Sequence, residues 1–95
     1  MNKYELCVVV SAKLEDDARA ELVDRVKDLI TRFEGTVTDV DDWGKKRLAY
    51  EIEKQHEGFY YFVRFESEPE TPGQIEGRLR IMDGVLRYLC VRQDA

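Results

Sequence analysis

Four stretches of the chain alternate apolar and polar residues with the two-residue period of a half-buried β-strand. In the first of them, Leu6, Val8 and Val10 form the stronger apolar side. The predicted strands are Tyr4–Val10, Thr36–Lys54, Phe59–Glu66 and Val85–Arg92, with a turn at Gln55–Gly58.

The long second strand contains a change of pattern. The apolar Val37 predicts that odd-numbered residues face the core, whereas the apolar residues at 48, 50 and 52 (Leu48, Tyr50 and Ile52) predict that even-numbered residues do. Because side chains alternate strictly along a strand, the register must slip between these positions. Gly44 is the expected site of a bulge.

Two segments have apolar residues at helical spacing. The first is Glu15–Phe33, with acidic residues in its first turn and Gly35 as a C-terminal stop. The second is Thr71–Asp83, where Thr71 and Gln74 match a capping box. The order of elements is therefore βαββαβ.

This order predicts an α+β fold, the ferredoxin-like split-βαβ sandwich. In that arrangement a four-stranded antiparallel sheet, in spatial order 4-1-3-2, carries two helices on one face. A length of 95 residues fits one domain, and we expect that domain to span residues 1–95.

Strand alternation also predicts which side chains lie on the sheet face that the helices leave uncovered. The set is rich in apolar residues, and contiguous exposed apolar surface usually marks a partner. A few tolerated surface apolar groups are the alternative. The residues predicted on this face are Glu5, Cys7, Val9, Arg47, Ala49, Glu51, Tyr60, Phe62, Arg64, Arg87, Leu89 and Val91.

Charge and composition narrow the function classes. The chain has 15 Lys and Arg against 20 Asp and Glu, which gives a formal net charge of -5. Proteins that bind nucleic acid unassisted are usually basic, so the charge argues against that class. The apolar runs Leu6–Val10 and Phe59–Val63 are too short for a membrane span or a signal peptide, and we expect a cytosolic protein.

Side chains for catalysis or metal binding are sparse. The single histidine, His56, is predicted in a turn, away from the mid-strand Cys7 and Cys90. The two cysteines are predicted on opposite faces of adjacent strands, so we expect reduced thiols and no disulfide. The acidic residues within 39–42 lack the spacing of a cation site. We predict no enzyme activity, cofactor, metal or small-molecule substrate.

Aromatic residues of the third strand match half of an RNA-recognition motif. Tyr60 and Phe62 would stack on bases, but the basic start of the motif is missing and Cys7 stands where an aromatic residue would face outward. The basic residues form two groups, each either a solvated rim or an RNA contact. They are Lys45, Lys46 and Arg47 beside Trp43, and Arg78, Arg80, Arg87 and Arg92 near Lys3.

Three stretches together resemble a known family. They are MNKYELCVVVSAKL, DWGKKRLAYEIEKQHEGFYYFVRF and LRIMDGVLRYLCVR. The most specific part is Gly44–Tyr50 followed by Gly58 and its aromatic neighbours. These stretches are similar to the bacterial small-subunit ribosomal protein six family, and the resemblance covers roughly Tyr4 to Val91.

The resemblance implies a structural role in the ribosome. It implies binding to the central domain of small-subunit ribosomal RNA as a heterodimer with ribosomal protein eighteen. That partner is basic, so an acidic, partly apolar chain would dock a basic protein and the pair would bind RNA.

Residue roles follow from matching motif positions and from the predicted uncovered face. The residues expected to contact RNA are Lys3, Arg80, Arg87 and Arg92, and those expected to contact the protein partner are Arg47, Ala49, Tyr60, Phe62, Arg64 and Leu89. Two departures from the family stand out. Glu51 replaces a frequent proline, and the chain ends at Ala95 without the extended tail of some members, so we expect no tail-dependent function.

Two other classes stay open. A ferredoxin-like domain can dimerise face to face and enclose a small ligand, which a tight homodimer would favour. A free-standing binder of single-stranded RNA would stack bases on Tyr60 and Phe62, and replacing both by alanine would then abolish RNA binding.

Overall fold

The computed structural model describes residues 1–52 and 54–93. Glu53, within the predicted second strand, and the last two residues of the predicted domain lie outside the described residues. The predicted order of elements is confirmed. The elements are β1 (Asn2–Ser11), α1 (Asp16–Arg32), β2 (Thr36–Ile52), β3 (Gln55–Ser67), α2 (Thr71–Leu79) and β4 (Val85–Gln93).

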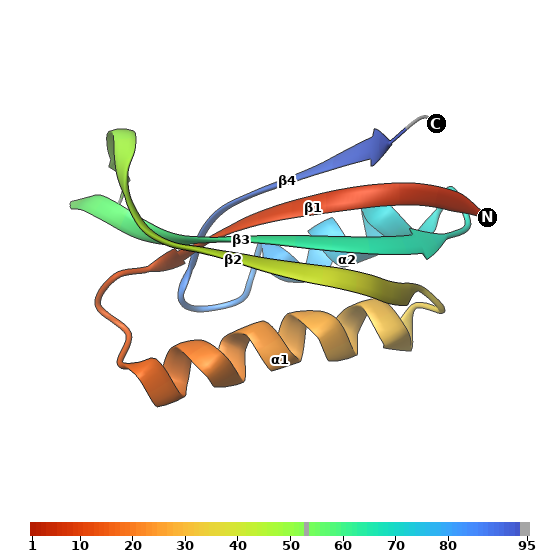
Figure 1. The fold of residues 1–95 in the computed structure, drawn as a ribbon, viewed down its shortest axis with the longest axis horizontal. Helices are drawn as coiled ribbons and strands as arrows, with labels where there is room; N and C mark the ends of the chain where they lie inside the picture. The colour runs from red at the N-terminus through yellow and green to blue at the C-terminus, as the bar shows by residue number, and fades with distance from the viewer. Residues whose placement is uncertain (53, 94–95) are drawn as a thin grey trace.

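The strands form one sheet in the order β2-β3-β1-β4, which is the predicted order read from the other edge. All three neighbouring pairs are antiparallel. Figure 1 shows both helices on the same side of the sheet, and the start of β1 and the end of β4 at the same end of the molecule.

The core lies between the helices and the sheet. In β1 the even-numbered residues face the core, and in β3 the odd-numbered residues do, because the even residues of β1 pair with the odd residues of β3. Removing a large core side chain typically costs about 2–5 kcal/mol of stability. The most deeply buried apolar side chains of the core are Leu6, Val8, Val10, Val26, Ile30, Val63, Phe65, Ile75 and Leu79.

Arg19 fastens the first turns of α1 to β3. Its Nε donates a hydrogen bond of 2.9 Å to the Tyr61 hydroxyl, and its guanidinium carbon lies 3.7 Å from the centre of the Phe59 ring. Nη2 also lies 2.8 Å from a carboxylate oxygen of Asp16. Burial raises the pKa of Tyr61, so its hydroxyl stays protonated.

Helix α2 is shorter than predicted and has a different start. It ends at Leu79, four residues before Asp83. Thr71 does not cap the helix; its hydroxyl donates a 3.0 Å hydrogen bond to the carbonyl of Phe33, at the end of α1. Gly84, with φ of 92°, turns the chain into β4. A left-handed backbone of this kind is accessible to glycine at little cost.

The predicted bulge at Gly44 is confirmed, but β2 slips twice before residue 48, not once. Thr38 and Trp43 are both extra residues relative to β3, and Gly44 has φ of 75°. Each slip of one residue moves the following side chains to the other face. The two slips cancel, so the prediction that Leu48 and Tyr50 face the helices is wrong.

The β2–β3 hairpin is also longer than predicted. The predicted turn Gln55–Gly58 is wrong, because these residues begin β3 and Gln55 pairs with Ile52. The Ser11 hydroxyl donates a 2.8 Å hydrogen bond to Oε1 of Gln55, which holds the hairpin to the end of β1. Figure 1 shows the end of this hairpin curling out of the plane of the sheet.

Candidate functional site

The sheet surface opposite the two helices, here named the open face, is organised in rows that cross the four strands. Each row takes one residue from β2, β3, β1 and β4 in that order, as fixed by the strand register. From the hairpin end toward the chain ends, the rows are Gly44, Tyr60, Val9 and Arg87; then Asp41, Phe62, Cys7 and Leu89; then Asp39, Arg64, Glu5 and Val91; then Thr36, Glu66, Lys3 and Gln93.

The second row is apolar across its centre. The bulged residue Trp43 packs its ring on Phe62, with 4.6 Å between ring centres, and remains 56% exposed. Leu89 is 54% exposed. The pKa of the Cys7 thiol is raised, mainly by burial and to a smaller extent by the charge of Glu5. This thiol therefore stays protonated and unreactive at neutral pH. The row therefore forms a contiguous, partly exposed apolar surface.

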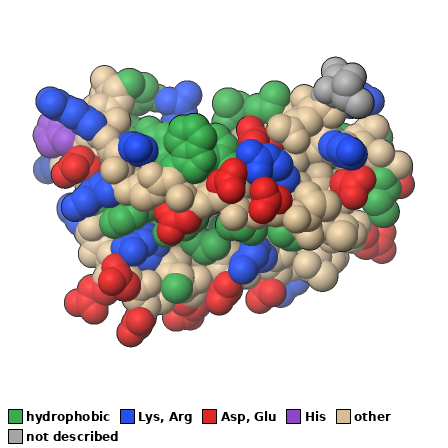
Figure 2. All heavy atoms as spheres, viewed as in Figure 1, with side chains coloured by type: hydrophobic (Ala, Val, Ile, Leu, Met, Phe, Trp, Pro, Cys, Tyr) green, Lys and Arg blue, Asp and Glu red, His purple; other side chains and the backbone are tan. Residues whose placement is uncertain are grey.

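The third row is charged and centres on Arg64. Its Nη1 lies 2.7 Å from Asp39 and 2.9 Å from Asp41, and its Nε lies 3.1 Å from Glu5. The hydrogen bond to Asp41 is the main cause that raises the pKa of Arg64. Three carboxylates around one guanidinium leave this cluster with a formal charge of -2. Figure 2 shows a blue group flanked by red beside the green apolar patch.

The hairpin covers the first row. Leu48 is buried, and a methyl group placed on Gly58 would lie 3.6 Å from Leu48 and 2.6 Å from Val9. Val9, predicted to be uncovered, is only 3% exposed. Tyr50 completes the cover, because its hydroxyl accepts a 2.9 Å hydrogen bond from Nη1 of Arg87 on β4. Leu48 and Tyr50 thus lie over the open face.

The residues predicted for a protein partner divide between the two sides of the sheet. Tyr60, Phe62, Arg64 and Leu89 share the open face. The placement of Arg47 and Ala49 on this face is wrong. Arg47 pairs with Glu57, which has the parity of the core-facing residues of β3, and Ala49 alternates with Leu48 and Tyr50. The cause is the slip at Thr38, which the prediction of a single slip at Gly44 did not include.

The residues predicted for RNA also divide. Lys3 and Arg87 lie on the open face, six positions apart along the sheet, or about 20 Å at strand spacing. Arg92 donates to Oδ1 of Asn2 on the helix side. A hydrogen bond to Tyr88, a core-side residue, raises the pKa of Arg80. No single surface of the molecule therefore carries all four.

Two residues of this face, Trp43 and Tyr50, are not among the site residues predicted from the sequence. Trp43 was noted only as a neighbour of basic residues, and Tyr50 was predicted to face the core. Both are large exposed side chains. The available signal was an aromatic residue directly before Gly44, where a bulge turns one extra side chain outward.

The remaining candidates lie elsewhere. Of the acidic residues within 39–42, Asp39 and Asp41 bind Arg64, and Asp42 accepts a 2.8 Å hydrogen bond from the Gly44 amide. Among residues 1–52 and 54–93, no group of three metal-ligating side chains is placed to hold an ion. Within the same residues, neither helix has the length and apolar character needed to cross a bilayer. Cys7 lies on the open face and Cys90, which pairs with Leu6, lies on the helix side, so the prediction that they occupy opposite faces of adjacent strands is confirmed. Both cysteines are free.

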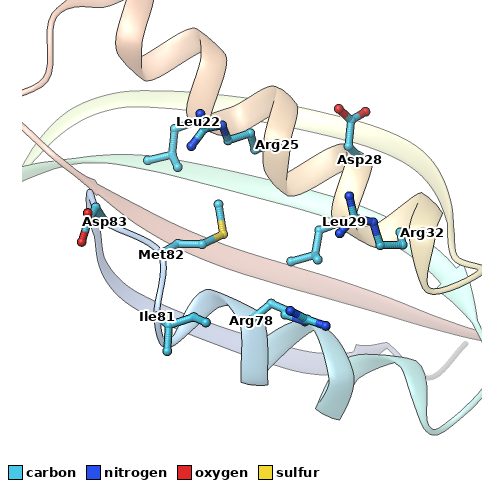
Figure 3. A pocket seen from close by; sticks show the side chains of 9 residues that line it. All are labelled: Leu22, Arg25, Asp28, Leu29, Arg32, Arg78, Ile81, Met82 and Asp83. Carbon is cyan, nitrogen blue, oxygen red and sulfur yellow. The ribbon is translucent and has the colours of Figure 1, made fainter.

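A hollow of about 550 Å³ lies on the helix side, between α1 and α2. Figure 3 shows Arg25 and Arg32 from α1 and Arg78 from α2 around it. Apolar side chains and two aspartates make up the rest of its lining. The residues that line it are Leu22, Arg25, Asp28, Leu29, Arg32, Arg78, Ile81, Met82 and Asp83. It is separated from the open face by the sheet.

Known proteins are similar to this chain in both sequence and structure. The profile described as ribosomal protein S6 matches residues 3–92. The small ribosomal subunit protein bS6 of Caldanaerobacter subterraneus subsp. tengcongensis is 44% identical, over 99% of each chain. The protein of the same name from Moorella thermoacetica is also 44% identical, over 97% of this chain and 94% of the relative.

The fold agrees with this assignment. The crystal structure of 30S ribosomal protein S6 from Thermotoga maritima matches with a TM-score of 0.91 at 28% identity, over 97% of this chain and 87% of that one. The C-terminal domain of MgtC from Mycobacterium tuberculosis, at 12% identity and a TM-score of 0.61, shares the fold alone. The chain therefore belongs to the ribosomal protein S6 family, as a structural, non-enzymatic component of the small ribosomal subunit.

Proposed function

We propose that this chain pairs with ribosomal protein eighteen through its open face, and that the heterodimer binds the central domain of small-subunit ribosomal RNA. As a component of the bacterial small subunit, the chain acts in the cytoplasm. The partner and the RNA region are the proposal; membership of the small subunit is its starting point.

The observation that carries the proposal is the pairing of an apolar row with an acidic row on one exposed face. Leu89, Phe62 and Trp43 supply apolar contact, and the carboxylates around Arg64 supply negative charge. A basic protein with apolar side chains complements both features. With a net charge of -5, the chain alone is repelled by RNA phosphates, and a basic partner reverses that balance.

Arg64 has a supporting role in this interface. Its guanidinium already holds Glu5, Asp39 and Asp41, so it fixes the directions in which those carboxylates point. A partner cation would meet oxygens whose side-chain freedom is already restricted, and less ordering entropy is then lost on binding. Tyr60 and Phe62 line the adjoining rows.

The proposal includes direct RNA contacts by Lys3, Arg80, Arg87 and Arg92, but not by all four residues to one RNA strand. One RNA strand on the open face would meet Lys3 or Arg87, whereas Arg80 and Arg92 lie on the helix side. Such phosphate contacts position the protein and carry no base information.

The test is RNA binding at one fixed salt concentration, with an RNA fragment of the central domain. This chain alone, the partner alone and the two together are compared. The proposal expects the pair to bind far more tightly than either protein. Equal binding by this chain alone would overturn the partner mechanism, and no binding by the pair would overturn the assignment of the RNA region.

A second measurement locates the partner site. Leu89→Asn removes an exposed apolar group from the open face, and Ile81→Asn removes one, 75% exposed, from the turn after α2. We expect weaker heterodimer formation from the first variant and unchanged formation from the second, measured by titration calorimetry. The reverse order would place the partner on the helix side.

A further inference from the structure

The hairpin end of the molecule is basic although the chain is acidic. Residues 44–57 together with Arg87 carry five cations and three carboxylates, so this end has a formal charge of +2 and the rest of the chain -7. Figure 2, in the orientation of Figure 1, shows blue side chains around the purple histidine at this end. Segregation of this kind gives the end a local field opposite to that of the whole protein.

Tyr50 and Arg87 contact each other at this end. Besides the 2.9 Å hydrogen bond between them, the Arg87 guanidinium carbon lies 5.7 Å from the centre of the Tyr50 ring. Tyr50 is 58% exposed. An arginine has five N–H donors, and this bond uses one of them. The guanidinium is thus held in place by a neutral hydroxyl and keeps its charge and most of its donors for a ligand.

Lys46 lies on the same side of the hairpin. It pairs with Gly58, which has the open-face parity of β3, and it alternates in phase with Leu48 and Tyr50. Among residues 1–52 and 54–93, neither Lys46 nor Arg87 has a carboxylate within ion-pair distance. Within the part of the chain that the structure describes, two cations without acidic partners therefore share one side of the hairpin end with the exposed ring of Tyr50.

We propose that Lys46, Tyr50 and Arg87 form an RNA contact site at the hairpin end, in which the two cations bind backbone phosphates and the Tyr50 ring stacks on an unpaired base. This inference rests on the proposed function for the identity of the nucleic acid. Arg87 is two residues from Leu89 on the same face of β4, so the site borders the proposed partner surface. RNA at this site would also touch the bound partner, which links RNA affinity to heterodimer formation.

The first test uses the heterodimer and the central-domain RNA fragment over a range of salt concentrations. Lys46→Gln and Arg87→Gln remove the charges singly; Lys27→Gln and Arg25→Gln are matched controls on α1, where both cations pair with acidic residues. We expect each hairpin variant to bind about 3- to 10-fold more weakly and to reduce the slope of log affinity against log salt by about one. Wild-type affinity and slope in the hairpin variants, or equal losses in the controls, would overturn the site.

Tyr50 separates stacking from positioning in the same assay. Tyr50→Phe keeps the ring and loses the bond to Arg87, whereas Tyr50→Ala loses both. We expect a smaller loss of affinity for the first variant than for the second, with the salt slope of Tyr50→Ala unchanged if the ring contributes stacking. Equal, wild-type affinity in both variants would exclude the ring from the site.

A partner-free readout keeps this inference distinct from the proposed function. The ¹⁵N-labelled chain is titrated at low salt with the same RNA fragment, and amide shifts are followed by NMR. We expect the largest shifts at residues 46, 50 and 87. Shifts confined to the helix side, or none at about 1 mM RNA, would overturn the site, given that weak non-specific binding falls near 10⁻⁴–10⁻⁶ M. A wild-type pair that binds no better than this chain alone would instead contradict the proposed function.

Discussion

Gly58 lies beneath the hairpin that covers the first row of the open face, and its replacement by alanine tests that packing directly. A methyl group at this position would lie 2.6 Å from Cγ1 of Val9 and 3.2 Å from the carbonyl oxygen of Val10. Both distances are shorter than ordinary van der Waals contact. Valine has few χ1 rotamers, and Val9 is almost fully buried, so the contact is relieved only by moving β1 or the hairpin.

The expected loss of stability follows from two opposing effects. Overpacking of this kind costs about 1–3 kcal/mol. Alanine also lowers the entropy of the unfolded chain, which returns about 0.5–1 kcal/mol. Because the approach of 2.6 Å is far below ordinary contact, the overpacking cost should lie in the upper half of its range, at about 2–3 kcal/mol. Gly58→Ala should therefore lower the free energy of unfolding by about 1–2.5 kcal/mol, which corresponds to a fall in Tm of roughly 5–20 °C for a domain of this size.

Urea unfolding followed by circular dichroism measures this difference. Gly77→Ala is the matched control, because a methyl group at this position in α2 would meet, within 4 Å, none of the described atoms beyond its chain neighbours and the backbone of its own helix. That variant should be more stable than the wild type by about 0.5–1 kcal/mol. The two variants should therefore change the free energy of unfolding in opposite directions, which distinguishes crowding at Gly58 from the general effect of replacing glycine by alanine.

The double variant with Val9→Ala decides whether the named contact is the cause. Removing Cγ1 of Val9 makes room for the new methyl group, so the double variant should be more stable than the sum of the single losses by about 1 kcal/mol. Additive losses would refute the close approach of Gly58 to Val9. A Gly58→Ala protein within about 0.5 kcal/mol of the wild type would refute the packing of the hairpin on β1.

Arg64→Met removes the only cation among three carboxylates, so association with a basic partner should become faster and more salt-dependent in stopped-flow measurements; an unchanged rate would contradict the charge argument. Arg19→Met should lower the free energy of unfolding by about 1–2 kcal/mol through loss of the Tyr61 bond and the ring contact, whereas Arg25→Met, at an exposed pair within α1, should cost less than about 0.5 kcal/mol in the same urea assay. Burial raises the pKa of Cys90 from 9.0 to about 11. Between these values the unfolded chain loses the thiol proton and the folded chain keeps it, so stability should fall as pH rises from about 9 to 11, and Cys90→Ala should show a shallower fall.

The topology could be predicted because β1, β3 and α1 each bury one side with few irregularities. Leu6, Val8 and Val10 are all in the core, and the single stripe of α1 needs only one surface to cover it. Connections then leave few arrangements for a βαββαβ chain. Alternation along a regular strand fixes the face of every residue once one residue is placed, and this condition holds for β1 and β3.

β2 does not meet that condition. An apolar residue such as Leu48 signals burial, but not the side of the sheet on which it is buried, and the core was assumed. The change of parity along β2 signals one slip, which was placed at Gly44, but the extra residue Thr38 is polar and leaves no mark in the hydrophobic pattern. Only the pairing with β3 reveals the slip at Thr38, and that pairing is a tertiary property. The misplacement of Arg47 and Ala49 follows from the same uncounted slip.

The division of the RNA candidates between two faces of the sheet could be predicted in part from the sequence. Arg87 and Arg92 are five positions apart on one strand, so alternation alone puts them on opposite faces. Motif matching grouped them without regard to face. On the open face, the rows of Leu89 and Arg64 lie between Arg87 and Lys3. A partner that covers those rows would separate the two cations, so the RNA contacts proposed at the hairpin end and at Lys3 would be geometrically independent of each other.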